Sequence, residues 1–375
     1  MERVYLDYAA TSFVRDEVFL RMRPYFSECF GNASGIYESG RRAANALEDS
    51  RKEIARLLSA KNPKEIYFTS GGTESNNWAI KGVMRAGGKK HMVTTVAEHH
   101  SVLQCCEALI KEGYKVTYLP TDANGLVSAG QVREAIHAET ALVSVMAVNN
   151  EVGTINPIDE IAAVTSAAGV LLHTDAVAAA GHRGLAAMRA DLLSFSAHKF
   201  YGPKGIGGLY ARDGVKLLPL IDGGAQERGR RAGTENIAGA VGMAEALRLA
   251  QDEMEHENAR LKDLRDALAR GIRERIPGAV INAGKAVRVE SYLNVLFPGT
   301  EARALLVALD HMGVECSAGS ACQTGSVHPS HVLLAMGLSR EDAAASLRFT
   351  LGRATTEEQI AYTVDCLEKV CAGNR

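Results

Sequence analysis

The sequence predicts an α/β protein with a seven-stranded, mostly parallel sheet and a second, smaller α+β domain. Two observations carry this prediction. Short apolar, β-branched runs recur at starts 22 to 29 residues apart, which leaves room for a strand and a crossover helix. The chain of 375 residues is also long enough for two domains that share an interface.

Six of the runs are rich in apolar and β-branched residues, which is typical of parallel strands buried on both faces. They lie at residues 66–69, 91–96, 115–119, 141–148, 170–175 and 192–196. A seventh run, at residues 207–211, begins only 15 residues after the sixth, and the gap holds Gly202, Pro203 and Gly205. A crossover helix does not fit there, so we expect the seventh strand to be antiparallel.

The second part of the chain has a different pattern. Residues 240–275 are rich in Ala, Leu, Glu and Arg at helical spacing and predict one long helix that bridges two domains. Further strands are expected at 291–297 and 314–317, and helices near 330–336 and 356–370. We therefore expect a large domain over residues 15–255 and a small domain formed by residues 1–14 and 256–375. The first few residues could pair in either domain.

Composition and charge exclude several classes of function. The chain is 46% hydrophobic and 23% charged, with a formal net charge of −2. It therefore lacks the excess of basic residues that would indicate nucleic-acid binding. No apolar run is long enough to span a membrane, and the first residues lack a secretory pattern. Seven cysteines make an odd count, which favours reduced thiols over a disulfide framework. These features predict a cytoplasmic protein.

The first predicted strand is followed by Ser-Gly-Gly-Thr-Glu-Ser-Asn-Asn at residues 70–77, which opens a helix. Glycines let backbone N–H groups converge, and a helix N-terminus favours negative charge, so this turn could bind a phosphate. The alternative is a plain strand-to-helix turn in which Thr73 or Ser75 is the N-cap.

Polar side chains also follow other predicted strands, where ligands of parallel α/β sheets bind. They are His99, Asn150, Asp175 and Lys199. A lysine can form a Schiff base with an aldehyde, a carboxylate can keep a pyridine nitrogen protonated, and an imidazole can stack on the ring. With a phosphate cradle beside them, these residue types predict a site for pyridoxal 5′-phosphate.

Several strings resemble those of the cysteine desulfurases of the NifS and IscS type. They are residues 70–77, Val-Asn-Asn-Glu-Val-Gly, His-Thr-Asp-Ala, Ser-Phe-Ser-Ala-His-Lys-Phe-Tyr-Gly-Pro-Lys-Gly and Arg-Arg-Ala-Gly-Thr-Glu-Asn. The resemblance runs from residue 5 to residue 353. It implies a fold-type-I pyridoxal phosphate enzyme of the class V aminotransferase superfamily, acting as a homodimer with shared active sites.

The resemblance also implies a role for each matching residue. Lys199 would form the Schiff base with the cofactor and move protons, while Asp175 would pair with the ring nitrogen. His99 would stack on the ring and take part in acid–base steps. Phosphate contacts would come from Gly72, Thr73, Ser196 and His198, and from Thr234 of the neighbouring subunit. Asn150 would lie near the ring oxygen and the substrate carboxylate, Arg348 would clamp that carboxylate, and Asn32 would contribute to the substrate site.

Residues 316–331 contain Cys316, Cys322, His328 and His331. One interpretation is a metal site, but the spacing does not match common zinc patterns, and we expect no metal. The other is a nucleophile on a loop rich in glycine and serine. The resemblance to the desulfurase loop makes Cys322 the residue that takes sulfur from L-cysteine as a persulfide, leaves L-alanine, and passes the sulfur to an acceptor such as an iron–sulfur scaffold or a thiolation protein.

Two positions depart from the family pattern. Ala178 stands where the family usually has a glutamine that donates to the ring oxygen of the cofactor, and Tyr37 stands where it usually has histidine. One missing neutral hydrogen bond is worth about 0.5–1.5 kcal/mol, so the cofactor should still bind. Alternatives on the same scaffold are a selenocysteine lyase, a class V aminotransferase and an inactive homologue that acts as a binding module.

Overall fold

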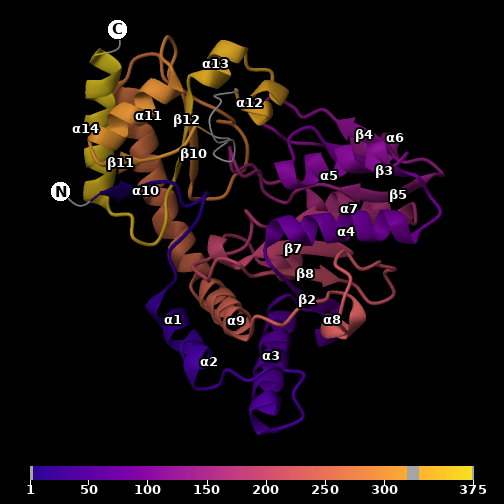
Figure 1. Cartoon of the computed structure of the whole chain (residues 1–375). Helices are drawn as coiled ribbons and strands as arrows, with labels where there is room; N and C mark the ends of the chain where they lie inside the picture. The colour runs from indigo at the N-terminus through magenta and orange to yellow at the C-terminus, as the bar shows by residue number, and fades with distance from the viewer. Residues whose placement is uncertain (1–2, 319–328, 374–375) are drawn as a thin grey trace.

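The computed structural model describes residues 3–318 and 329–373 and contains the expected seven-stranded sheet (Figure 1). Its strands are β2 (Ile66–Thr69), β3 (His91–Thr95), β4 (Lys115–Leu119), β5 (Thr140–Ser144), β6 (Leu171–Asp175), β7 (Leu192–Ser196) and β8 (Gly207–Ala211). The strand order is β2-β8-β7-β6-β5-β3-β4. Only β8 runs antiparallel to its neighbours, so the predicted fold class and the reversed seventh strand are confirmed.

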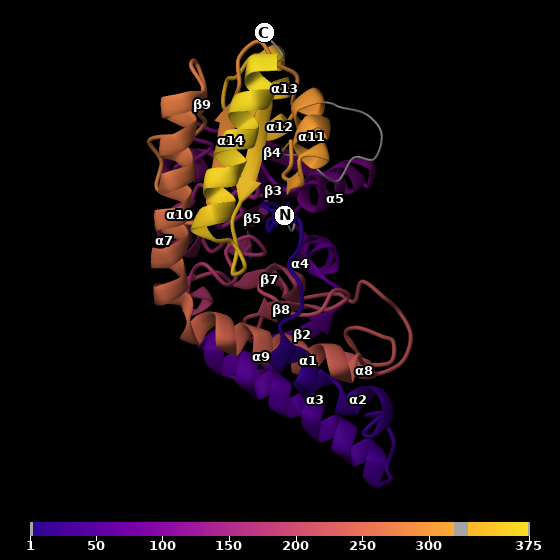
Figure 2. The same ribbon diagram turned by 90° about the vertical axis from the view of Figure 1, so that its left-hand side faces the viewer.

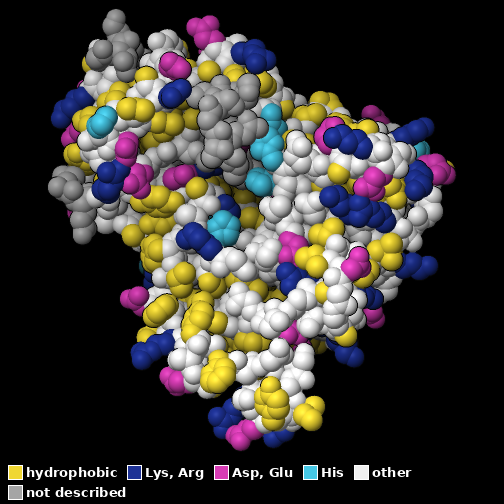
Figure 3. Space-filling view, viewed as in Figure 1, with side chains coloured by type: hydrophobic (Ala, Val, Ile, Leu, Met, Phe, Trp, Pro, Cys, Tyr) yellow, Lys and Arg dark blue, Asp and Glu magenta, His cyan; other side chains and the backbone are white. Residues whose placement is uncertain are grey.

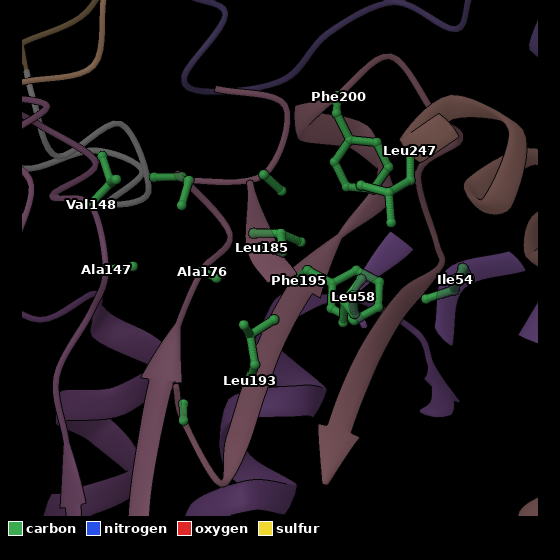
Figure 4. Close-up of a cluster of buried hydrophobic side chains, with 14 of the residues drawn as sticks. Ile54, Leu58, Ala147, Val148, Ala176, Leu185, Leu193, Phe195, Phe200 and Leu247 are labelled. Atoms are coloured by element: carbon green, nitrogen blue, oxygen red, sulfur yellow. The ribbon is translucent and has the colours of Figure 1, made fainter. Parts of the chain in front are cut away.

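Successive side chains along each strand of the large sheet pack in two different hydrophobic cores, one on each face of the sheet. Leu193 lies in a core with helix residues such as Ile54, whereas Leu192 lies in a second core with Trp78. The first of these cores is drawn in Figure 4, where Leu193, Phe195 and Leu247 lie on one side of the strands. Because side chains alternate across a strand, this division means that both faces of the sheet are buried, as parallel sheets require.

Helices cover the two faces. One core takes residues from α1 (Asp16–Met22), α3 (Glu38–Leu57), α6 (Ala129–Ala135), α7 (Ile158–Ala167) and α9 (Ile237–Asp252). The opposite core takes residues from α4 (Gly72–Ala86) and α5 (His100–Lys111). Two further short helices are α2 (Pro24–Ser27) and α8 (Gln226–Gly229). No helix in the described part of the chain is long and apolar enough to cross a membrane.

Strand β5 ends earlier than the sequence predicts, at Ser144 instead of residue 148. The N–H group of Met146 donates to the buried carboxylate of Glu98 at 2.9 Å instead of pairing with β3. The chain still follows β6, since the N–H of Ala147 donates to the carbonyl of Asp175. Glu98 therefore ends the β5–β3 pairing and turns residues 145–151 toward the end of the sheet.

The second part of the chain forms two small sheets and a core of its own (Figure 2). Strands β12 (Ser346–Thr350), β10 (Tyr292–Leu296) and β9 (Val280–Ile281) are antiparallel, and β1 (Val4–Tyr5) pairs in parallel with β11 (Val314–Glu315). They pack with helices α10 (Met254–Arg275), α11 (Ala302–His311) and α14 (Glu357–Gly373). The first strand thus packs with the second part of the chain, since Val4 lies in its core. The domain boundaries expected from the sequence stay a prediction.

The prediction of a single helix over residues 240–275 is wrong, because the structure has two helices that meet at Glu253. The carboxylate of Glu253 accepts hydrogen bonds from Arg15, at 2.7 Å, and from Arg353. Arg15 immediately precedes α1, and Arg353 follows β12. These tertiary contacts, which helix propensity does not encode, hold the bend between α9 and α10.

Helices α12 (His331–Ala335) and α13 (Arg340–Ala344) pack in a small satellite core. Val332 and Leu333 lie there with Ala97, which follows β3, and Val152, which follows β5. Hydrophobic contacts therefore hold the start of α12 against the ends of two strands of the large sheet, and this position brings His331 to the functional site.

Candidate active site

A cavity of about 340 Å³ lies beyond the carboxyl ends of β6 and β7, at the N-terminal ends of α4 and α5. Most of the residues predicted for the site line it, namely Gly72, Thr73, His99, Asn150, Asp175, Ser196, His198, Lys199 and Arg348. Histidine side chains gather near the centre of this face of the molecule (Figure 3). The convergence follows from the parallel sheet, since its strands deliver their following residues to one edge.

Helix α4 begins at Gly72 on the wall of the cavity. A Cβ atom at this position would lie 2.6 Å from Cγ2 of Val177, so only glycine fits. The next residue, Thr73, is exposed and also lines the cavity. A helix N-terminus with a glycine and a hydroxyl beside it can bind a phosphate through its N–H groups and its dipole.

Asp175 and His99 are joined by a hydrogen-bond chain. Asn76 donates to Oδ2 of Asp175 at 2.7 Å and to Oγ of Ser101 at 2.9 Å, and that hydroxyl lies 2.8 Å from Nδ1 of His99. The N–H of Val177 donates to the other oxygen of Asp175 at 2.9 Å. The carboxylate is therefore held in one orientation, 4% exposed, and ready to accept a further hydrogen bond from a ring nitrogen.

The side chain of His99 is the N-cap of helix α5. Its Nδ1 atom accepts a hydrogen bond from the N–H of Ser101 at 3.1 Å. Burial lowers the pKa of His99, and Asp175 opposes that change. The neutral ring is thus favoured, with its hydrogen on Nε2, because Nδ1 must keep a lone pair to accept.

Lys199 ends a short 3-10 turn that follows β7. Its Nζ atom donates to the carbonyl oxygens of Ala9 and Ala10, the second at 2.9 Å. The adjacent His198 has its pKa lowered to about 4 by burial and by the positive charges of Lys199 and Lys204. A neutral His198 can accept or donate one hydrogen bond to a ligand without adding charge.

Arg348 lies in the middle of β12 and is 3% exposed. Its Nη2 atom donates to Oδ1 of Asp7 at 2.8 Å, and its Nη1 atom donates to the carbonyl of Asn150 at 2.9 Å. Burial acts to lower the pKa of Arg348, but Asp7, Tyr292 and Glu151 together outweigh it, so the pKa is raised. A permanently charged guanidinium thus lines the cavity from the second sheet.

Two predicted site residues do not line the cavity, and a third is not among the described residues. Asn32 is exposed, and its Oδ1 atom accepts from the N–H of Ser34 at 2.9 Å. Thr234 is also exposed and away from the cavity. Cys322 lies outside the described residues. Within residues 3–318 and 329–373, no group of three or more His, Cys, Asp or Glu side chains could hold a metal ion.

Sequence reasoning missed several residues of the cavity wall. Asn76 lies within the same string as Gly72, one helical turn further on, and this spacing could have revealed it. The backbone carbonyl groups of Ala9 and Ala10 could not be found from the sequence, because an alanine side chain gives no sign of what its backbone contacts. His331 also lines the cavity, at the start of α12. It drew attention only as part of a metal pattern.

The chain matches the model of the aminotransferase class-V family over residues 4–362 and therefore belongs to that family. Among curated proteins it is similar to the cysteine desulfurase IscS of Clostridium botulinum, with 48% identity over 380 residues that cover 100% of this chain and 96% of the relative.

Solved structures show the same fold. A NifS-like protein superposes with a TM-score of 0.93 at 36% identity, covering 99% of this chain and all of the other. A structure described as SspA in complex with cysteine superposes with a TM-score of 0.82 at 38% identity, covering 93% of this chain and 98% of that one.

Enzymes of this family use pyridoxal phosphate, and the cavity fits that group. Its volume is within the range of small-molecule sites, about 300–1,000 Å³. The donor set is also suitable, since a helix N-terminus lies on the same cavity as a carboxylate, an imidazole and a primary amine. Oδ1 of Asn150 is buried without a hydrogen-bond partner among the described residues, as expected of a group that binds a polar ligand.

Proposed function

We propose that the protein is a pyridoxal phosphate-dependent cysteine desulfurase that converts L-cysteine to L-alanine and leaves the sulfur as a persulfide on Cys322. The observation that carries the proposal is the convergence of Lys199, Asp175, His99 and Arg348 on one cavity. The full-length similarity to curated cysteine desulfurases supports the substrate.

Bound pyridoxal phosphate supplies an aldehyde that condenses with amines and a ring that withdraws electrons from Cα. Gly72, Thr73, Ser196 and His198 would hold its phosphate, together with the N-terminus of α4. Asp175, fixed by Asn76 and Val177, would keep the ring nitrogen protonated. His99 would stack on the ring and offer the hydrogen on Nε2 as a donor.

At the substrate end, Arg348 would bind the carboxylate of the amino acid, and Asn150 would contact it through its side chain. Lys199 would remove the proton from Cα with its Nζ atom and return a proton later. Asp7 and the carbonyl of Asn150 hold the guanidinium in place before substrate arrives, which reduces the entropy that binding costs.

Replacing Arg348 by lysine should raise the KM for L-cysteine about 10- to 100-fold, because a lysine retains the charge but cannot bind a carboxylate through two parallel hydrogen bonds. Steady-state kinetics on L-cysteine would measure this change. The amount of bound cofactor, measured by its absorbance, should stay near the wild-type value. An unchanged KM would contradict the assignment of Arg348.

We also propose a homodimer in which Thr234 reaches the phosphate of the neighbouring subunit. Its exposed position away from the cavity supports this role. Around α1, α2 and the start of α3, large apolar side chains are exposed, as expected of a surface that a second subunit covers. These side chains are Phe19, Leu20, Phe26, Phe30, Ile36 and Tyr37. Asn32, proposed for the substrate site, lies in the same segment.

The sulfur acceptor is proposed to be another protein, such as an iron–sulfur scaffold or a thiolation protein, because the relatives include IscS proteins. A cytoplasmic location is proposed on the basis of the thiols. Five cysteines in the described part of the chain are free thiols, and reducing compartments keep cysteines in that form; they are Cys29, Cys105, Cys106, Cys316 and Cys366.

The function is tested by supplying the purified protein with L-cysteine, with L-selenocysteine, and with L-alanine plus a keto acid. A desulfurase is expected to release one alanine for each sulfur recovered from L-cysteine in the presence of a thiol reductant. Faster turnover of selenocysteine alone would favour a selenocysteine lyase, and amino-group exchange with the keto acid would favour an aminotransferase. No turnover of any of the three would indicate an inactive homologue.

A further inference from the structure

His331 is a cavity residue to which the proposed function assigns no role. Its Nε2 atom lies 2.9 Å from the carbonyl oxygen of Glu98. A carbonyl can only accept a hydrogen bond, so Nε2 must carry the hydrogen. In the neutral ring the lone pair is then on Nδ1, for which no hydrogen-bond partner is found among the described residues.

His99 has the opposite arrangement. Its Nδ1 accepts from the N–H of Ser101, so its hydrogen is on Nε2. The two imidazoles on the cavity wall therefore differ in what they can do when neutral: His99 can give a proton, and His331 can take one. They are linked through the backbone, because the carbonyl that fixes the ring of His331 belongs to the residue just before His99.

The groups around His331 come from three elements. The ring of His100, on α5, lies 4.7 Å away between centroids, and burial and the charge of His331 lower the pKa of His100. Glu98, which follows β3, is fully buried; this burial raises the pKa of its carboxyl to about 8. Glu151, which follows β5, accepts a hydrogen bond from Ser330, the N-cap of α12.

Three more charged groups share the cavity with His331, namely Asp175, Lys199 and Arg348. His100 is the nearest ring, and its Nε2 atom is buried without a hydrogen-bond partner among the described residues. Two imidazoles in contact disfavour a charge on either ring. The lone pair on Nδ1 of His331 can accept a proton, and Glu151, which lines the same cavity, can stabilise the imidazolium that results.

We propose that His331 is the proton acceptor for the thiol of the substrate and takes the Sγ proton on Nδ1 as the Cβ–Sγ bond breaks. The inference rests on the proposed desulfurase function. In this step the proposed nucleophile, the thiolate of Cys322, attacks Sγ of the substrate and forms the S–S bond. The electron pair of the Cβ–Sγ bond goes to Cβ. The Sγ proton goes to Nδ1, so that an anionic persulfide and an imidazolium are formed.

The decisive variant is His331→Gln. A glutamine amide can still donate to the carbonyl of Glu98, but it has no basic nitrogen. The kcat for L-cysteine should fall about 100-fold with little change in KM. The absorbance of bound cofactor should not change, which shows that the site is intact.

Selenocysteine provides the matched substrate, because its selenol is already ionised at neutral pH and needs no base. The loss caused by His331→Gln should therefore be much smaller on L-selenocysteine than on L-cysteine. A merely structural role of His331 would reduce turnover of both substrates equally. Nitrogen NMR of histidine-labelled apoprotein should also show that the unprotonated nitrogen of His331 is Nδ1.

Two results would overturn the inference: a kcat of His331→Gln within threefold of wild type on L-cysteine, or equal losses on the two substrates. Failure of the proposed function is distinguishable, because the wild-type protein would then release no alanine from L-cysteine.

Discussion

Lys199→Ala is expected to lower alanine release from L-cysteine by at least about 1,000-fold, since no other group would then take the proton from Cα. Lys199 stands on a short turn at the end of β7, and its Nζ atom reaches the carbonyls of Ala9 and Ala10. It is a surface-accessible group in a cavity and not a core side chain, so the variant should fold. Alanine release and the melting temperature measure the two effects.

Lys204→Ala is the matched control. Lys204 is an exposed lysine in the same string and does not line the cavity. Its loss should leave turnover within about twofold of wild type, as is usual for surface changes. Borohydride reduction of the cofactor-loaded protein should label the peptide that contains Lys199 and not the one that contains Lys204. Label on another lysine would contradict the assignment.

Cys322→Ala is expected to reduce release of alanine and of transferable sulfur to less than about a hundredth of wild type, because the nucleophile that receives the sulfur is gone. The variant should still bind cofactor and L-cysteine, since the proposed binding residues are elsewhere. Absorbance changes on addition of L-cysteine would test binding, and labelling of the protein-bound persulfide would test transfer.

Cys316→Ala is the control for this experiment. Burial raises the pKa of the Cys316 thiol, and the negative charge of Asp7 raises it further, so this thiol is a poor nucleophile at neutral pH. Persulfide formation should survive its removal. Two results would show that Cys322 is not the nucleophile. One is persulfide formation by Cys322→Ala at the wild-type rate, and the other is loss of persulfide only in Cys316→Ala.

The sheet could be predicted from the sequence because its strands are short apolar runs whose spacing leaves room for crossover helices. The reversal at β8 followed from the short gap after residue 196. The break at Glu253 could not be predicted, because it depends on Arg15 and Arg353, which are distant in sequence. The early end of β5 depends in the same way on the carboxylate of Glu98.

The cavity could be predicted to the extent that its residues follow strands, as Asp175 and Lys199 do. Arg348 came from the resemblance, since it lies within a strand of the other sheet. His331 carried no usable signal, because its role depends on which of its two nitrogens is bonded to Glu98. Tautomers follow from three-dimensional contacts and not from residue types.

The junction at Glu253 has a consequence for how the molecule unfolds. One carboxylate serves two arginines, one near each end of the chain. If the segment before α1 detaches, the segment after β12 keeps its arginine paired, but the bend between α9 and α10 loses one of its two restraints. Segments near the beginning and near the end of the chain are thus both tied to the middle of the sequence at one carboxylate, although they are far apart along it.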